Sequence, residues 1–204
     1  MTKKFLNSAY GHASGEEARA FYDEWAASYD DELSEGGYIT PARCAAALAG
    51  ASRDADRPIL DLGCGTGLSG VALQRAGFSV VDGWDPSPEM LRRAETRQVY
   101  RVLRQIDPLA PLTAPPSAYA AVNAAGVMSP GLAPPETFDA ILGFLPKDGL
   151  IAFSLNDHAM EDGAHHARLM EIVDTGAGRL LFKEYGDHIP GTGLKAWVFV
   201  LQKA

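Results

Sequence analysis

Three glycines, Gly63, Gly65 and Gly67, follow directly on a short apolar run at residues 58–62. An apolar run of this length that ends in glycines predicts a buried strand and a tight turn. Glycine also lets a ligand approach the backbone closely, because no Cβ stands in the way. Residues 69–76 then have the pattern of a helix. A strand, a glycine-rich turn and a helix in this order predict the first βα unit of an α/β fold, with a ligand site at the turn.

Strands and helices alternate along the rest of the chain. Further strands are expected at residues 78–84, 99–106, 119–124, 150–155, 180–185 and 196–201, and helices at 86–97, 135–145 and 160–173. This alternation predicts βαβ units and a mostly parallel sheet with helices on both faces. Only residues 188–195 link the last two strands, which is too short for a crossover, so these strands should form a hairpin. We therefore expect an α/β, Rossmann-like, doubly wound seven-stranded sheet, mostly parallel, with a C-terminal antiparallel hairpin.

The N-terminal region lacks this alternation. Residues 1–15 are polar and are interpreted as a loose arm, followed by an amphipathic helix. A second helix is expected to begin with Thr40 as its N-cap and Pro41 in its first turn. We expect residues 1–57 to form a helical arm and lid, and residues 58–204 to form the ligand-binding part of a single domain.

Charge and composition disfavour several classes of partner. The chain has 26 acidic and 18 basic residues, a formal net charge of −8, and such a surface repels a nucleic-acid backbone. No stretch approaches the ~18 apolar residues of a membrane span, and the N-terminus shows no signal peptide. Two isolated cysteines, Cys44 and Cys64, predict neither a disulfide framework nor a metal site. We expect a cytoplasmic protein with no nucleic-acid, membrane or metal partner.

Two acidic residues near the glycines bear on the cofactor, but only the first of them helps to choose between candidates. The dinucleotide fingerprint is G-x-G-x-x-G, whereas this chain has G-x-G-x-G, preceded by Asp61. An acid there suits a cationic ligand end better than a pyrophosphate. Asp85, at the end of the second expected strand, can accept hydrogen bonds from both hydroxyls of a ribose. That feature is shared by sites for NAD and for S-adenosylmethionine (SAM), so it does not separate them.

Both segments resemble motifs of the class I SAM-dependent methyltransferases. Residues 61–67 are similar to the first motif, and residues 83–90, with the pattern G-x-D-x-S-x-x-M, are similar to the second. The resemblance implies that SAM is the cofactor and that a methyl group is transferred. Its site residues would be Asp61, Gly63 and Gly65 at the methionine part, Asp85 at the ribose, the turn Ser87 to Met90 near the adenine, and Asp107 at the adenine amino group. The other predicted cofactor-binding residues are Cys64, Gly67, Pro86 and Tyr29.

The segment at residues 22–30 has the pattern Y-D-x-W-A-x-x-Y-D. It is similar to a segment of many small-molecule methyltransferases, including the Williams-Beuren-region methyltransferase-like proteins. The resemblance implies that this helix covers the cofactor and that Tyr29 touches the cofactor carboxylate. A lid of this kind favours a closed site for a small-molecule acceptor.

No catalytic residue is obvious, and the chemistry explains why. Methyl transfer from a sulfonium needs mainly positioning and exclusion of water, and a base is needed only if the acceptor must lose a proton. Candidates are His158, at the end of the fifth strand, His188, in the hairpin link, and Tyr29. The adjacent His165 and His166 are expected to point to different faces of a helix and to be exposed.

Several alternatives stay open at this point. The acceptor, the atom that receives the methyl group and the oligomeric state are not fixed by any motif. The chain could be a non-catalytic SAM-binding regulatory protein. An NAD-dependent oxidoreductase is disfavoured by the glycine spacing and Asp61, and a protein-methylating role would need an open groove.

Overall fold

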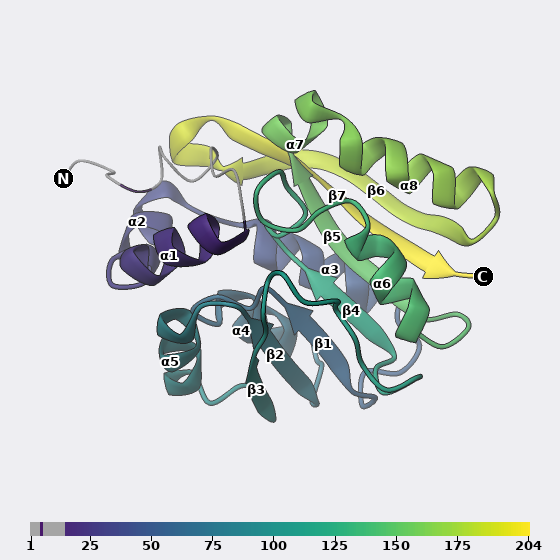
Figure 1. Ribbon diagram of the computed structural model, residues 1–204, viewed down its shortest axis with the longest axis horizontal. Coiled ribbons are helices and arrows are strands. Elements are labelled where there is room, and N and C mark those ends of the chain that lie inside the picture. Colours follow the sequence, from purple (N-terminus) through teal and green to yellow (C-terminus); the bar gives the residue numbers. More distant parts are fainter. Residues whose placement is uncertain (1–4, 6–14) are drawn as a thin grey trace.

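A seven-stranded sheet forms the centre of the computed structural model, which describes Phe5 and residues 15–204 (Figure 1). The strand order is β3-β2-β1-β4-β5-β7-β6. The strands are β1 (Ile59–Leu62), β2 (Val81–Asp85), β3 (Val102–Gln105), β4 (Ala121–Ala124), β5 (Leu150–Asn156), β6 (Gly178–Ile189) and β7 (Leu194–Lys203). β1 to β5 pair in parallel, and β7 is antiparallel to both of its neighbours, β5 and β6. The expected α/β sheet with a C-terminal antiparallel hairpin is confirmed.

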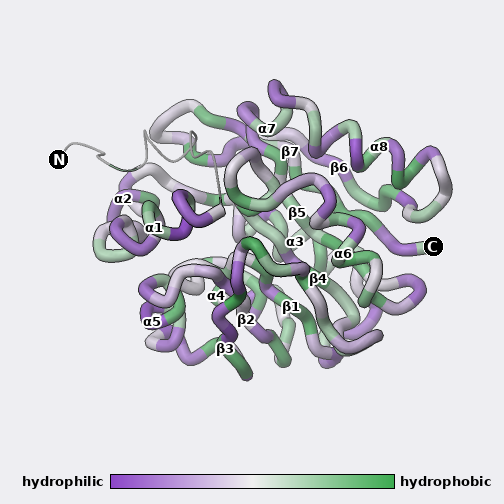
Figure 2. Tube along the Cα trace, in the orientation of Figure 1, coloured by the Kyte–Doolittle hydropathy of each residue, from purple (hydrophilic) through white to green (hydrophobic). Residues whose placement is uncertain are grey.

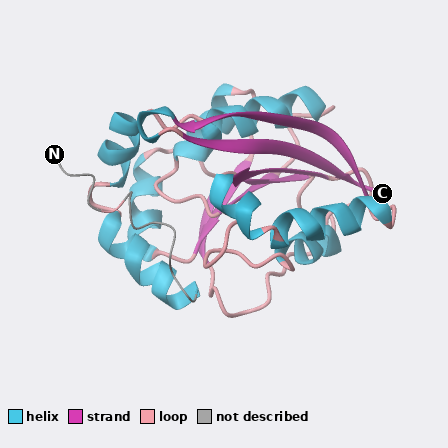
Figure 3. Ribbon diagram, turned by 90° about the horizontal axis from the view of Figure 1, so that it is seen from above, coloured by secondary structure: helices cyan, strands magenta, loops and turns pink. Residues whose placement is uncertain are grey.

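Helices lie on both sides of the sheet (Figure 3). In chain order they are α1 (Gly15–Trp25), α2 (Tyr29–Gly36), α3 (Thr40–Ala51), α4 (Leu68–Arg75), α5 (Pro88–Thr96), α6 (Thr137–Phe144), α7 (Asp157–Asp162) and α8 (Ala164–Asp174). α3 and α4 pack on one face through buried side chains such as Leu48 and Leu73. α6 and α8 pack on the other face through Phe138, Ile141 and Leu169. Among the described residues, no helix is long and apolar enough to cross a membrane.

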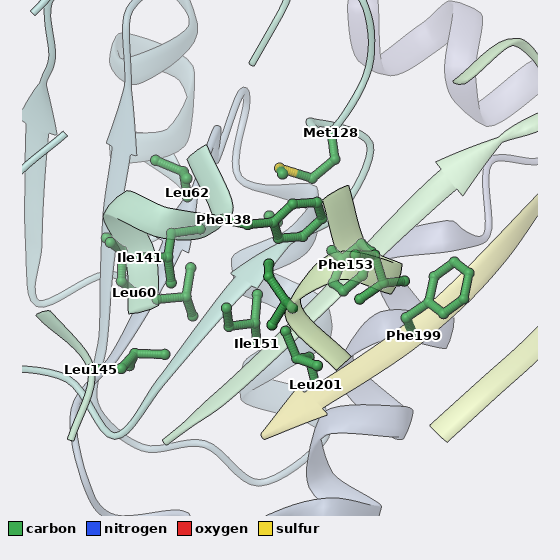
Figure 4. Close-up of a cluster of buried hydrophobic side chains, with 14 of the residues drawn as sticks. Leu60, Leu62, Met128, Phe138, Ile141, Leu145, Ile151, Phe153, Phe199 and Leu201 are labelled. Atoms are coloured by element: carbon green, nitrogen blue, oxygen red, sulfur yellow. The ribbon is translucent and has the colours of Figure 1, made fainter. Parts of the chain in front are cut away.

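The larger core cluster joins α6 to the central strands. Phe138 and Phe153 meet edge to face with ring centroids 4.8 Å apart, and Phe153 stacks on Phe199 at 5.1 Å (Figure 4). The hydropathy colouring follows this packing, because hydrophobic residues concentrate in the strands and hydrophilic ones on the outer side of α8 (Figure 2). Burial of β1, β2, β4 and β5 on both faces is typical of parallel strands between two helical layers. The core therefore fixes where the strand ends lie.

Two expected helix features are wrong in detail. The single helix expected at residues 160–173 is broken into α7 and α8 at Gly163, whose φ of +80° lies in the left-handed region that ends a helix. Thr40 is not the N-cap of α3 but its first residue, and Ile39 precedes it. The Thr40 hydroxyl instead lies 2.7 Å from Nδ1 of His188, so a distant buried partner replaces the local cap.

Two N-terminal helices, α1 and α2, form one layer beside the glycine turn (Figure 1). They share an aromatic cluster in which Trp25 and Leu33 are buried with Ile189 of β6. We call α1 and α2 the lid. α3 follows them in sequence but packs on the sheet. Except for Phe5 and Gly15, the loose arm expected at residues 1–15 lies outside the described residues.

Candidate active site

A cavity of about 610 Å³ lies at the carboxyl ends of the parallel strands. One end of it is lined by residues that follow β1, β2 and β3, including Gly65, Pro86 and Asp107. The other end is lined by the segment after β4 and by the start of α6, including Val127 and Thr137. This is where α/β sheets of this type bind ligands, and the volume lies within the range of about 300–1,000 Å³ that is usual for small-molecule sites.

The glycine turn forms part of the cavity wall. Gly63, Gly65 and Gly67 all have positive φ, at +64°, +53° and +91°. A Cβ at Gly63 would lie 2.4 Å from a methyl carbon of Val127, so any other residue there would have to displace Val127. A Cβ at Gly65 would meet no atom within 4 Å. Because Gly65 also lines the cavity, its missing side chain leaves free space where a ligand can touch the backbone.

Asp85 is a buried carboxylate that faces this cavity. One carboxylate oxygen accepts a hydrogen bond from the Gly65 amide and the other accepts one from the Ser87 amide, each at 2.8 Å. Burial raises the pKa of Asp85 to about 6, although the two amide hydrogen bonds oppose this shift. A carboxylate has about four lone-pair sites, so two acceptor positions are left for a ligand.

Asp61 has a different environment, because it is fully buried and does not line the cavity. It accepts hydrogen bonds from the hydroxyls of Ser69 at 2.6 Å and Tyr100 at 2.7 Å, and from the amide of Asn123 at 2.8 Å. Burial raises the pKa of the Asp61 carboxyl, and the three hydrogen bonds oppose this shift. Asp61 therefore joins β1, β4, α4 and the segment before β3 beneath the glycine turn.

Two aspartates fasten the lid to the walls of the cavity. Asp23 of α1 accepts a hydrogen bond from the Ser87 hydroxyl at the start of α5, at 2.5 Å. Asp30 of α2 accepts one from the Thr66 hydroxyl at 2.5 Å and forms an ion pair with Arg97. The lid is thus attached both to the glycine turn and to the helix after β2.

The predicted cofactor residues divide into two groups. Those that line the cavity are Gly63, Gly65, Asp85, Pro86, Met90, Asp107 and Tyr29. The others lie behind the wall. Asp61 and Cys64 are buried, Gly67 precedes the first turn of α4, and Ser87 caps α5 by accepting a hydrogen bond from the Met90 amide at 3.0 Å.

The histidine candidates lie away from the cavity. His158 is exposed on α7, and neither it nor His188 lines the cavity. His188 is buried, and burial together with the nearby Arg43 lowers its pKa to about 4. The expectation that His165 is exposed is wrong, because its Nε2 lies buried 2.7 Å from the Ala133 carbonyl oxygen. The third candidate, Tyr29, does line the cavity.

Sequence reasoning missed several residues of the cavity wall. Arg104 of β3 lies over the Trp84 ring, 4.7 Å from its centroid, and both line the cavity. Glu136 lines the opposite end, just before α6. The loop at residues 108–113 also lines it. None of these residues belongs to a motif, so only their position in the fold could reveal them.

The family match covers most of the chain. Residues 38–192 match the model of a family described as a methyltransferase domain. Human methyltransferase-like protein 27 is 32% identical over 132 residues, which make up 63% of this chain and 54% of that protein. The chain therefore spans about half the length of the curated relative that it matches.

Solved structures show the same fold at low sequence identity. The [4+2]-cyclase SpnF matches with a TM-score of 0.71 and 16% identity over 94% of this chain and 97% of that one. A SAM-dependent methyltransferase from Geobacter sulfurreducens, solved with S-adenosylhomocysteine (SAH), matches with a TM-score of 0.60 and 14% identity over 79% and 91%. A SAM-dependent methyltransferase from Thiobacillus denitrificans, also solved with SAH, matches with a TM-score of 0.57 and 13% identity over 79% of this chain and 91% of that one.

Proposed function

Because this chain belongs to the methyltransferase domain family, we propose that it moves a methyl group from SAM to a small-molecule acceptor inside the 610 Å³ cavity. The observation that carries the proposal is the continuity of this cavity. It joins the glycine turn and Asp85 to the wall formed after β4 and by α6. A cofactor on the first wall would therefore share one space with an acceptor on the second.

The residues present suit SAM at the first wall. We assign the ribose to Asp85, whose carboxylate keeps acceptor capacity beside the two amides it binds. Gly63 and Gly65 would face the methionine part, where the open space at Gly65 admits a ligand. Asp107, which lines the cavity after β3, is assigned to the adenine amino group. Asp61 would act indirectly, by holding the turn from beneath.

Residues from the lid favour a small acceptor over a macromolecule. Gly15, Ala18 and Tyr22 of α1 and Tyr29 of α2 line the cavity, so the lid forms one of its walls. In this proposal residues 1–57 supply the arm and lid and residues 58–204 the SAM-binding part of a single domain. With the lid as one wall, the cavity would help to exclude water from a bound acceptor and to hold it in a fixed orientation.

SAM supplies a methyl group that is already activated by a positive sulfur. The chain therefore has to hold the acceptor and keep water out, and it needs a base only for acceptors that must lose a proton. Tyr29 is the one predicted catalytic candidate on the cavity wall. His158 and His188, which do not line the cavity, are given no role in the transfer.

Calorimetry with SAM, SAH and NAD tests the cofactor assignment. We expect both sulfur ligands to bind and NAD not to bind. Asp85→Ala should weaken binding of SAM and SAH about ten- to a hundredfold, the cost of a lost charged hydrogen-bonding partner. Asp31→Ala is the matched control, because Asp31 is exposed on α2 and outside the cavity.

Turnover requires a second measurement. Small acceptors would be screened with methyl-labelled SAM, and the reaction would be followed by formation of SAH and transfer of label. SAH formation with a defined methylated product would establish the transferase activity. Tight SAM binding with no transfer to any acceptor would favour a regulatory SAM-binding protein instead.

A further inference from the structure

Glu136 stands out among the charged side chains of the cavity wall. Five charged residues line the cavity: Arg19, Asp85, Arg104, Asp107 and Glu136. Four of them have partners: Arg19 pairs with Asp23, Arg104 lies over Trp84, and the two aspartates accept backbone hydrogen bonds. Within the part of the chain that the structure describes, no hydrogen bond or ion pair engages the Glu136 carboxylate.

The Glu136 carboxylate does not cap the helix that follows it either. Glu136 occupies the N-cap position of α6, but its side chain makes no capping hydrogen bond. Many helices begin with a side chain that satisfies their free amides. At Glu136 that option is not taken, and the side chain is solvent-exposed at a residue that lines the cavity.

Glu136 is exposed to solvent, and apolar residues close to it in sequence also line the cavity. Val127, Leu132, Pro134 and Ala140 line the same end of the cavity. Ligand sites usually combine an apolar wall with a few polar groups that fix the orientation of the ligand. At this end Glu136 would be such a group, and its negative charge would attract a cation and repel an anion.

We propose that Glu136 selects acceptors that have an apolar body and a positively charged amine. The apolar body would lie against Val127, Leu132 and Ala140, and the ammonium group would pair with the carboxylate. This inference rests on the proposed function, because it places the acceptor at the end of the cavity opposite Asp85. It does not depend on which atom of the acceptor receives the methyl group.

Three probes of similar shape and different charge test the proposal. Tryptamine is cationic, tryptophol is neutral and indole-3-propionate is anionic. Each would be titrated by calorimetry into the full chain saturated with SAH, which lacks the sulfonium charge. We expect tryptamine to bind about fivefold more tightly than tryptophol, as for a solvent-accessible ion pair, and indole-3-propionate to bind most weakly.

Glu136→Gln should erase the preference for tryptamine. The affinity of the protein for SAH should stay unchanged in this variant. The matched control is Glu95→Gln, an exposed glutamate on α5 outside the cavity, which should keep the preference. Salt at ~1 M, where the screening length is about 3 Å, should reduce the preference in the native chain. A purely structural role for Glu136 would not produce this dependence on probe charge and salt.

Equal affinities for the three probes, tighter binding of the acid, or the same preference in Glu136→Gln and native protein would overturn this proposal. A failure of the cofactor assignment, on which the proposed function depends, looks different. In that case the native chain would not bind SAH at all, before any probe is added.

Discussion

The Thr66 hydroxyl donates a hydrogen bond of 2.5 Å to Asp30, which also pairs with Arg97. One side chain of the lid thus contacts both the glycine turn and the end of α5. Because this turn forms part of the cavity wall, the position of α2 and the shape of the wall depend on each other.

We expect Asp30→Asn to lower the free energy of unfolding by about 1 kcal/mol, because it weakens a charged hydrogen bond and a partly exposed ion pair. Affinity for SAH should fall as well, since the glycine turn loses its attachment to the lid. Chemical denaturation and calorimetry measure the two effects. The neighbouring Asp31→Asn, at an exposed position, is the control, and equal effects of the two substitutions would refute the role given to Asp30.

Gly65→Ala, compared with a matched glycine substitution elsewhere, tests whether the glycine turn binds the cofactor. Gly65 has φ of +53°, and a Cβ there would enter open space in the cavity. We expect about 1 kcal/mol of destabilisation from the left-handed backbone and a loss of SAH binding of at least about tenfold.

Gly176→Ala provides the matched comparison. Gly176 has φ of +74°, a Cβ there would meet no atom within 4 Å, and the residue lies outside the cavity. It should show a similar loss of stability in thermal unfolding with unchanged SAH affinity. If SAH binds Gly65→Ala as tightly as the native chain, the glycine turn does not hold the cofactor.

SAH binding should weaken in acid because of Asp85. Burial raises its pKa to about 6, so the carboxylate is ionised above pH 6 and protonated below it. The ionised form is the better acceptor for ribose hydroxyls. We expect affinity to fall by up to about tenfold per pH unit below pH 6. Calorimetry at several pH values measures this, and Asp85→Asn should give weak binding with no such pH dependence.

His188 should make folding sensitive to acid in the opposite sense to a buried carboxyl. Burial lowers its pKa to about 4, from 6.5 for an ordinary histidine. The folded state favours neutral His188, so its contribution is present above pH 6.5 and is lost as the pH falls toward 4.

The difference in unfolding free energy between the native chain and His188→Gln isolates this contribution from those of the carboxyls. We expect the advantage of the native chain over the variant to decrease by about 3 kcal/mol between pH 6.5 and 4. Denaturation curves at several pH values measure it. A constant difference across this range would show that folding does not lower the pKa of His188. Affinity for SAH above pH 6.5 should be the same in both proteins, because His188 does not line the cavity.

Local patterns predicted most of the sheet. β1, β4 and β5 are short, mainly apolar runs, and the short link at residues 188–195 indicated the hairpin. The division between α7 and α8 was missed, because Gly163 within a periodic stretch can be tolerated or can end a helix. The structure decides this with a φ of +80° at that residue.

The cavity wall was predicted only in part. Glycines and acids at strand ends carry a local signal, so Gly65 and Asp85 could be predicted from the sequence pattern, and Asp107 from the family resemblance. Glu136 and Arg104 carry no local signal, because whether they line the cavity depends on which distant segments of the chain surround it. His165 was misjudged for the same reason, since its partner is a loop carbonyl at Ala133, far away in sequence.

The connection between β3 and β4 has a consequence for how this chain can diverge. Residues 106–120 contain no helix, include four prolines and supply part of the cavity wall through residues 108–113. Asp61 and Asp85, by contrast, are anchored by hydrogen bonds to several elements. Substitutions or length changes within residues 108–113 can therefore reshape the cavity without disturbing Asp107 or the buried carboxylates. Ligand preference could be altered over evolutionary time, or in a directed library, while the machinery for the methyl donor is inherited intact.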